Sequence, residues 1–276
     1  MDVVELTSWE NILATNQEVE PPIMRGTAVV GIDYKKINNF VVAGVLTKQG
    51  EKFVFRQHTW ICANSVDLQH INFPYMEAVE AGDAEIIDAP EISPELIADW
   101  IAVQMGFYNI SMVAMDNYRV VLMKTALARV GFSYENKNIK LVCPSDKIKI
   151  EPIIDSGFHN HNIVYGNCPI MRWYANNVRK EKDKYGNYTY QEIDLERRKT
   201  EGFFAFVYAM TQYELLMPKK KEDGEGDLYK KAKEFAIRIM NKPNPTAQEL
   251  ATLPQILKVL MDQKAIRNIH GDIREE

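Results

Sequence analysis

Three acidic residues occupy positions where chemistry is expected. Asp33 closes an apolar run at 27–34 (TAVVGIDY) that has the composition of a buried strand, and Asp116 ends a second apolar strand. Glu201 lies near the start of a long apolar helical stretch. A carboxylate that loses its water without gaining a partner is costly, so acids beside a core predict a bound cation or a hydrogen-bond network.

Each of these acids also has a simpler interpretation. Asp33 and Asp116 are suited to cap a turn after a strand, and Glu201 would complement the helix dipole. All three together favour a metal site, because adjacent carboxylates repel each other and a divalent cation relieves that repulsion. Other acids near Glu201 would replace or supplement it, and these are Glu192, Asp194 and Glu196.

The types of residue also indicate which metal. Oxygen ligands without His or Cys suit Mg²⁺ or Mn²⁺, and a pair of such ions assists phosphodiester hydrolysis by activating water and stabilising the leaving oxygen. His159 and His161 suggest a zinc or HNH-type site, but the other histidines are distant, so both are predicted to be ordinary loop or strand residues. The three cysteines form no CxxC pair, which predicts free thiols.

Composition predicts a soluble globular protein with one domain and a tail. The chain has 276 residues, of which 46% are hydrophobic and 26% charged. It contains no run near the ~18 apolar residues of a membrane helix, and its acidic beginning does not resemble a signal peptide. We therefore expect an intracellular protein without membrane contact. The net charge of −5 still permits local basic patches that bind nucleic acid.

The elements that position the acids follow from hydrophobic periodicity. Strands at 27–34, 40–47 and 52–62, with a tight turn at 48–51, predict an antiparallel meander. Residues 94–142 then alternate helix, strand, helix, strand, which implies parallel pairing with right-handed crossovers. The expected class is α/β, with a central mixed sheet flanked by helices.

Four segments are expected along the chain. Residues 1–26 are polar and predict a lead-in segment that packs loosely or connects to a preceding part. Residues 27–217 form the main domain. A charged linker with a helix follows at 218–245, and a C-terminal helical appendage follows at 246–276.

Basic residues gather around a predicted hairpin that turns at 184–187. Lysine and arginine side chains there are suited to contact DNA phosphates, although a solvated surface gives the same pattern. Lys199, shortly before Glu201, would contact DNA or balance the acidic site. The predicted DNA-binding residues are Arg172, Arg179, Lys180, Lys182, Lys184 and Lys199.

The acids at the ends of the first and fourth strands and at a late helix form the layout of an RNase H-like fold. Over roughly residues 25–216, the chain resembles the C-terminal nuclease domain of tailed-phage large terminase subunits. The matching segments come in family order: GIDYKKINNFVVAGVL, FVFRQHTWIC, PYMEAVEAGDAEIID, AMDNYR, HNIVYGNCPIMRWYANNV and RRKTEGFFAFVYAM.

The resemblance implies a Mg²⁺- or Mn²⁺-dependent endonuclease with a two-metal site that cuts concatemeric double-stranded DNA. Asp33, Asp116 and Glu201 would be the catalytic and metal-binding residues. The implied partners are a terminase ATPase domain, the small terminase subunit and the portal protein, in the host cytoplasm during phage assembly. Two alternatives remain open: a Holliday-junction resolvase or transposase-like nuclease of the same fold, and a non-catalytic module that docks on a motor or portal.

Three departures from the family pattern stand out. Asn38 and Asn39 occupy the region where the family usually has a further Asp after the first catalytic one. Glu201 precedes Gly202 where an Asp is usual. No GxxxxGK[ST] phosphate loop occurs in the chain, so we expect an isolated nuclease domain that cannot itself power translocation.

Overall fold

The computed structural model describes residues 3–20, 26–194 and 197–217, together with 235–239, 242, 246 and 253–254. The chain divides into two compact units, Met1–Met217 and Pro218–Glu276. The predicted linker at 218–245 and appendage at 246–276 lie almost entirely outside the described residues. Within those residues, no helix combines the length and apolar character needed to cross a membrane.

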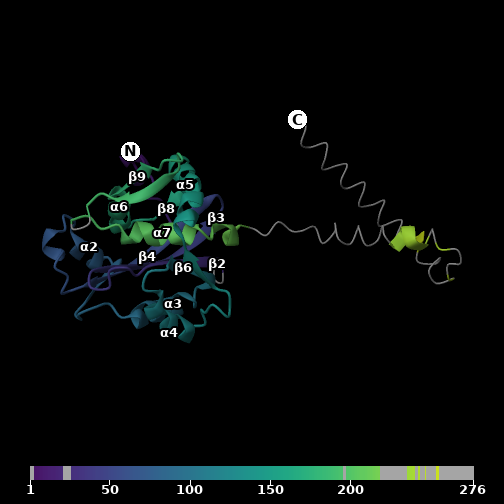
Figure 1. The fold of residues 1–276 in the computed structure, drawn as a ribbon, viewed down its shortest axis with the longest axis horizontal. Coiled ribbons are helices and arrows are strands. Elements are labelled where there is room, and N and C mark those ends of the chain that lie inside the picture. Colours follow the sequence, from purple (N-terminus) through teal and green to yellow (C-terminus); the bar gives the residue numbers. More distant parts are fainter. Residues whose placement is uncertain are drawn as a thin grey trace. The chain divides into compact units, whose positions relative to one another are not determined.

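The predicted antiparallel meander is present. It consists of β2 (Gly26–Asp33), β3 (Phe40–Gln49) and β4 (Lys52–Cys62) (Figure 1). Gln49 pairs with Lys52, which leaves a two-residue turn where Gly50 has a φ of 58°. A positive φ is what such a tight hairpin turn requires, and glycine adopts it without strain.

Parallel strands extend this meander on both sides, so the sheet is mixed as predicted. β6 (Tyr108–Asp116) pairs with β2, β7 (Ile139–Val142) pairs with β6, and β5 (Ala84–Ile87) pairs with β4. The strand order is β5-β4-β3-β2-β6-β7, and the short β8 (Ile163–Val164) also pairs with β4. β2 and β3 are almost entirely buried because helices cover both faces of the sheet.

Two groups of helices cover the two faces (Figure 1). α3 (Pro94–Gln104) and α4 (Val120–Arg129) pack against one face, where Val30 and Ile32 of β2 point. The helices associated with the other face are α2 (Tyr75–Glu80), α5 (Pro144–His159), α6 (Pro169–Asn176) and α7 (Glu201–Met210). Short 3-10 turns occur at Leu68–His70 and Tyr213–Leu216.

A smaller sheet contains the predicted hairpin. β9 (Val178–Lys182) and β10 (Tyr188–Glu192) pair with each other, and β1 (Val3–Glu5) adds to β9, giving the order β1-β9-β10. The helix α1 (Trp9–Leu13) follows β1. The start of the chain thus differs from the loosely packed segment that we expected, because Leu6 and Ile12 are buried in the main core.

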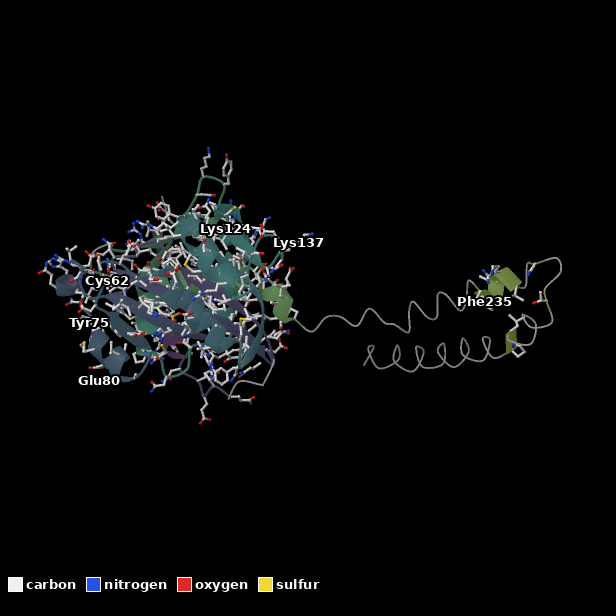
Figure 2. The ribbon with its side chains drawn as sticks, turned by 90° about the horizontal axis from the view of Figure 1, so that it is seen from below. Cys62, Tyr75, Glu80, Lys124, Lys137 and Phe235 are labelled. Carbon is white, nitrogen blue, oxygen red and sulfur yellow. The ribbon has the colours of Figure 1, made fainter. Side chains whose placement is uncertain are left out.

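The cysteines are free thiols, as predicted. Cys62 (labelled in Figure 2) and Cys168 are buried, whereas Cys143 is exposed at the start of α5. The thiol of Cys62 donates to the carbonyl oxygen of Ala89 at 3.2 Å. The Cys62 side chain is therefore packed in the protein interior.

α7 lies directly on β2, and Gly31 makes this close approach possible. A Cβ added at Gly31 would be 1.9 Å from the carbonyl oxygen of Ala205. All ten residues of α7 are buried, so the helix forms the centre of its layer. Gly31 is two residues before Asp33 and Ala205 is one turn after Glu201, so this contact brings the two predicted acids into the same region.

Gly31→Ala should destabilise the protein severely. The added methyl group would overlap a backbone oxygen of a buried helix, and overpacking of this kind costs about 3 kcal/mol or more when the backbone must shift. Urea unfolding followed by circular dichroism would measure the free energy of unfolding. Gly106→Ala is the matched control, because Gly106 is exposed and its added Cβ would meet only the Val103 carbonyl oxygen, at 3.1 Å instead of 1.9 Å. Equal stability of the two variants would contradict the proposed packing constraint.

Candidate functional site

Asp33 and Asp116 end two neighbouring parallel strands. In the register of β2 and β6, Ile32 lies opposite Met115, so Asp33 and Asp116 are the next residues on the two strands. Adjacent strands are about 4.8 Å apart, which brings the two carboxylates to one edge of the sheet. The negative charge of Asp116 raises the pKa of Asp33. The structure therefore brings together the first two acids of the prediction.

Asp33 is an almost fully buried carboxylate, with 2% of its surface exposed. Burial raises its pKa, the ammonium group of Lys35 lowers it, and the charge of Glu192 raises it again. Lys35 Nζ lies 3.8 Å from Asp33 Oδ2, and the Lys35 backbone N–H donates to Oδ1 at 3.4 Å. The pKa remains raised overall, so these contacts only partly compensate the buried charge.

Glu201 is the first residue of α7 and is 4% exposed. Burial raises its pKa to about 7, the charge of Lys36 opposes this, and the charge of Asp33 adds to it. The backbone N–H of Thr200 donates to Glu201 Oε2 at 2.9 Å. Glu201 is thus electrostatically coupled to Asp33, and all three predicted acids belong to one interacting group.

Glu192 is a fourth member of this group, which we call the acid group: Asp33, Asp116, Glu192 and Glu201. Glu192 ends β10, and its charge raises the pKa of Asp33. Its carboxylate pairs with Lys36 at 3.6 Å. Among the alternative ligands, Asp194 accepts a hydrogen bond from the Arg197 backbone N–H at 3.0 Å, and Glu196 lies outside the described residues.

Cations and a tyrosine surround the acid group, and sequence reasoning did not identify them. Lys35 lies over the rings of Phe204, at 4.6 Å, and Tyr208, at 5.4 Å. Lys147 of α5 lies 5.9 Å from the same Phe204 ring, and burial and the charge of Lys35 lower its pKa. The Tyr208 hydroxyl donates to Asp116 Oδ2 at 3.4 Å. The position of Lys35, two residues after Asp33, was the one signal available in the sequence.

The acid group matches a divalent cation in the type of its ligands. Hard carboxylate oxygens that are buried and repel one another are what Mg²⁺ or Mn²⁺ would neutralise. Among the residues that the structure describes, no three His, Cys, Asp or Glu side chains are grouped tightly enough to hold a metal ion as they stand. Lys35 forms an ion pair with Asp33, and Lys36 forms one with Glu192.

Three of the predicted DNA-binding residues are internal, so the prediction that they contact DNA must be corrected. Arg172 is buried and donates to the Gly166 carbonyl oxygen at 2.8 Å. Lys180 is buried and pairs with Glu151 at 3.1 Å and also with Asp155. Their basic groups therefore stabilise the interior.

Lys199 is the third of these residues, and it is 1% exposed. Its ammonium group pairs with Asp67, which also accepts a hydrogen bond from the side-chain amide of Asn39. Asn39, one of the two residues in the region of the missing family Asp, thus belongs to this internal link. The other predicted DNA-binding residues remain accessible: Arg179 is half-buried, and Lys182 and Lys184 are exposed.

The two adjacent histidines have ordinary partners. His159 Nδ1 lies 2.9 Å from the Asp155 carbonyl oxygen, and His161 Nε2 lies 3.1 Å from Asn11 Oδ1. His159 is the last residue of α5, so the prediction of a loop or strand position is wrong for it, whereas His161 lies in the turn that follows the helix.

Comparison with known proteins identifies the fold. No protein-family model matches the chain, and no curated protein does. Among solved structures, the chain is similar to the HK97 bacteriophage large terminase, with 16% identity and a TM-score of 0.66 over 76% of this chain. It is also similar to the large terminase nuclease from thermophilic phage G20c, with 10% identity, a TM-score of 0.49 and coverage of 76% of this chain and 99% of that one.

The first likeness shows the fold. The chain shares its fold, a central mixed sheet flanked by helices, with the matched part of the HK97 large terminase. This confirms the predicted fold class. It spans 44% of the length of the HK97 protein.

Glu201→Gln should stabilise the protein at neutral to alkaline pH. Because the folded-state pKa is raised from 4.5 to about 7, the folded state binds more protons and its stability falls as the pH rises from about 4.5 through 7. Above that range the charged Glu201 costs about 3 kcal/mol, which glutamine removes while keeping an oxygen acceptor for Thr200 N–H.

Urea unfolding at pH 4 and pH 8 would measure this difference. The gain should be present at pH 8 and absent at pH 4, whereas the exposed Glu214→Gln should behave like the unaltered protein at both. A Glu201→Gln protein that is less stable at both pH values would contradict the buried-charge account.

Proposed function

We propose that this chain is a metal-dependent endonuclease domain that cuts double-stranded DNA, in the manner of a large terminase. The acid group carries the proposal, because four carboxylates from β2, β6, β10 and α7 converge at one edge of the sheet in a terminase nuclease fold. Asp33, Asp116 and Glu201 would hold one or two Mg²⁺ or Mn²⁺ ions, with Glu192 as an additional ligand. When bound, such ions activate water and stabilise the leaving oxygen of a phosphodiester.

The surrounding residues would prepare the site for a phosphodiester. The carboxylates alone would repel the negative charge of the phosphodiester. The ammonium groups of Lys35, just after β2, and Lys147, on α5, both lie over the Phe204 ring and would reduce that repulsion. Tyr208 would orient Asp116 through its hydroxyl group. Burial of Asp33 and Glu201 excludes water and strengthens each of these electrostatic interactions.

The hairpin of β9 and β10 is the proposed surface for the DNA backbone. Lys182 and Lys184 are exposed on it, and Tyr185 at its turn is also exposed. β10 ends at Glu192 in the acid group, so the same strand leads from the exposed lysines to the site. Contacts with phosphates at such a surface give affinity without sequence preference.

The terminase context extends the proposal to partners. An ATPase domain, a small terminase subunit and a portal protein would position the DNA, in the host cytoplasm during phage assembly. Residues 27–217 would be the nuclease domain, 218–245 a charged linker with a helix, and 246–276 a helical appendage. The proposed substrate in this setting is concatemeric double-stranded DNA.

Mn²⁺-dependent nicking of supercoiled plasmid would test the proposed function. Asp33→Asn and Asp116→Asn should each lower the nicking rate at least about 100-fold, since even outer-shell changes at metal sites cost 10–100-fold. Calorimetric titration with Mn²⁺ should show weaker binding in the same variants. The pairing of a lost rate with lost metal affinity separates a ligand from a residue that only supports the fold.

Asp99→Asn is the matched control, because Asp99 is an exposed carboxylate on α3 that pairs with Arg129. It should nick plasmid and bind Mn²⁺ like the unaltered chain. Mn²⁺ binding that survives in both Asp33→Asn and Asp116→Asn would rule out the proposed site.

Lys182→Ala and Lys184→Ala should weaken DNA binding similarly for all sequences. Each lost phosphate contact should reduce the slope of log K against log salt by about 1. Fluorescence anisotropy with a 30-base-pair duplex at several salt concentrations would measure this. Lys180→Ala is the contrasting variant, which should lower stability because Glu151 and Asp155 lose their partner. An unchanged salt slope in both hairpin variants would refute the proposed DNA surface.

A further inference from the structure

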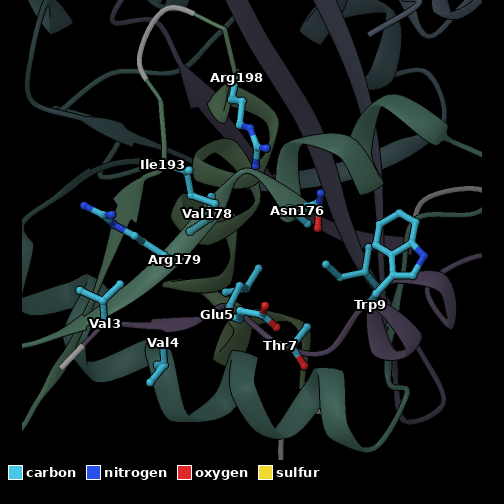
Figure 3. A pocket seen from close by; sticks show the side chains of 13 residues that line it. Val3, Val4, Glu5, Thr7, Trp9, Asn176, Val178, Arg179, Ile193 and Arg198 are labelled. Atoms are coloured by element: carbon cyan, nitrogen blue, oxygen red, sulfur yellow. The ribbon is translucent and has the colours of Figure 1, made fainter. Parts of the chain in front are cut away.

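A groove of about 390 Å³ lies at the small sheet (Figure 3). It is lined by residues of the paired strands β1 and β9, of α1, of the end of α6 and of the segment after β10. Figure 3 shows Arg198 pointing into the groove, with Trp9 and Arg179 at its two ends. None of its lining residues belongs to the acid group.

The groove is lined by apolar side chains that are unusually exposed. Val3 is 50% exposed, Trp9 53% and Ile193 40%. Single exposed apolar residues are ordinary, but a contiguous group of them bordered by polar residues is typical of a surface that binds another molecule.

The charges of the groove favour an anionic group in that molecule. Arg179 and Arg198 line it together with Glu5, which faces Arg179 across β1 and β9. Glu5 offsets one of the two positive charges. Neither arginine makes an ion pair with a described residue, and Arg179 Nε is buried without a hydrogen-bond partner there. A carboxylate would complement the remaining charge.

We propose that this groove binds a segment of a separate polypeptide in which apolar side chains flank a carboxylate. Arginines beside Trp9 would also suit a nucleic acid, but bases stack on aromatic rings and gain little from aliphatic side chains such as Val3, Val4 and Ile193. The groove is separate from the proposed catalytic residues, and this inference does not depend on them.

A fluorescein-labelled 12-residue peptide that alternates valine and glutamate, with one central tryptophan, is the probe. Two matched peptides carry lysine in place of glutamate, or serine in place of the apolar residues. Fluorescence anisotropy with the full chain should show that the glutamate peptide binds at least about tenfold more tightly than either. Ile193→Asp should lose this binding, and Arg198→Glu should reverse the preference toward the lysine peptide.

Val121→Asp is the control, since Val121 is 80% exposed on α4 and does not line the groove. It should bind the peptides like the unaltered chain, and thermal unfolding should confirm that each variant is folded. The proposal is overturned if the glutamate peptide binds the unaltered chain and Ile193→Asp equally, or binds neither. It is also overturned if Arg198→Glu leaves the preference unchanged, or if a 12-nucleotide single strand binds in place of the peptide and is lost in Ile193→Asp.

Discussion

The contact between the backbones of α7 and β2 is the constraint on which the rest of the structure depends. Gly31 allows the Ala205 carbonyl group to approach the strand where any side chain would obstruct it. Because α7 is buried along its whole length, its first residue, Glu201, is fixed in the interior near the end of β2. Close packing thus determines where the acidic charges lie, and electrostatics follows from packing.

That placement puts negative charges where water cannot solvate them. The raised pKa values of Asp33 and Glu201 both have burial as their largest cause. The charges of Glu192 and Asp116 add to the rise for Asp33, and the charge of Asp33 adds to the rise for Glu201. Lys35 and Lys36, in the loop after β2, partly compensate the negative charge of the carboxylates through ion pairs with Asp33 and Glu192. Lys147 adds a third ammonium group from α5. The charged carboxylates therefore lower the stability of the fold at this place, as expected of buried charges that are only partly compensated.

The sequence was sufficient to predict the strands and helices that have a regular pattern of apolar residues. Alternation of apolar residues predicted the β2–β4 meander, and the α and β alternation predicted the parallel strands β6 and β7. The proximity of Asp33 and Asp116 could be predicted from these strands, because both residues end neighbouring parallel strands in matching register. Glu192 was one of several candidates, because its position depends on the pairing of β10 in a separate sheet.

The exposure of individual long side chains could not be inferred in the same way. Lysine and arginine have apolar stems that pack inside a protein while the charged group finds a buried partner. Lys180 and Lys199 do this with acids that are 25 and 132 positions away in the sequence, which only the tertiary fold brings close. Tyr208 has the helical spacing of a core aromatic, and its hydroxyl group nevertheless reaches Asp116.

The end of β10 connects the acid group with the groove. Glu192 belongs to the first and Ile193 lines the second, so consecutive residues serve the two surfaces. Asn177 holds this strand end in place: its carbonyl oxygen accepts from Ile193 N at 3.1 Å, and its side-chain amide donates to the Lys199 carbonyl oxygen at 2.8 Å. Lys199 leads directly into Glu201. The buried Asn177 therefore links the residue after Glu192 to the segment that leads into α7 through two hydrogen bonds.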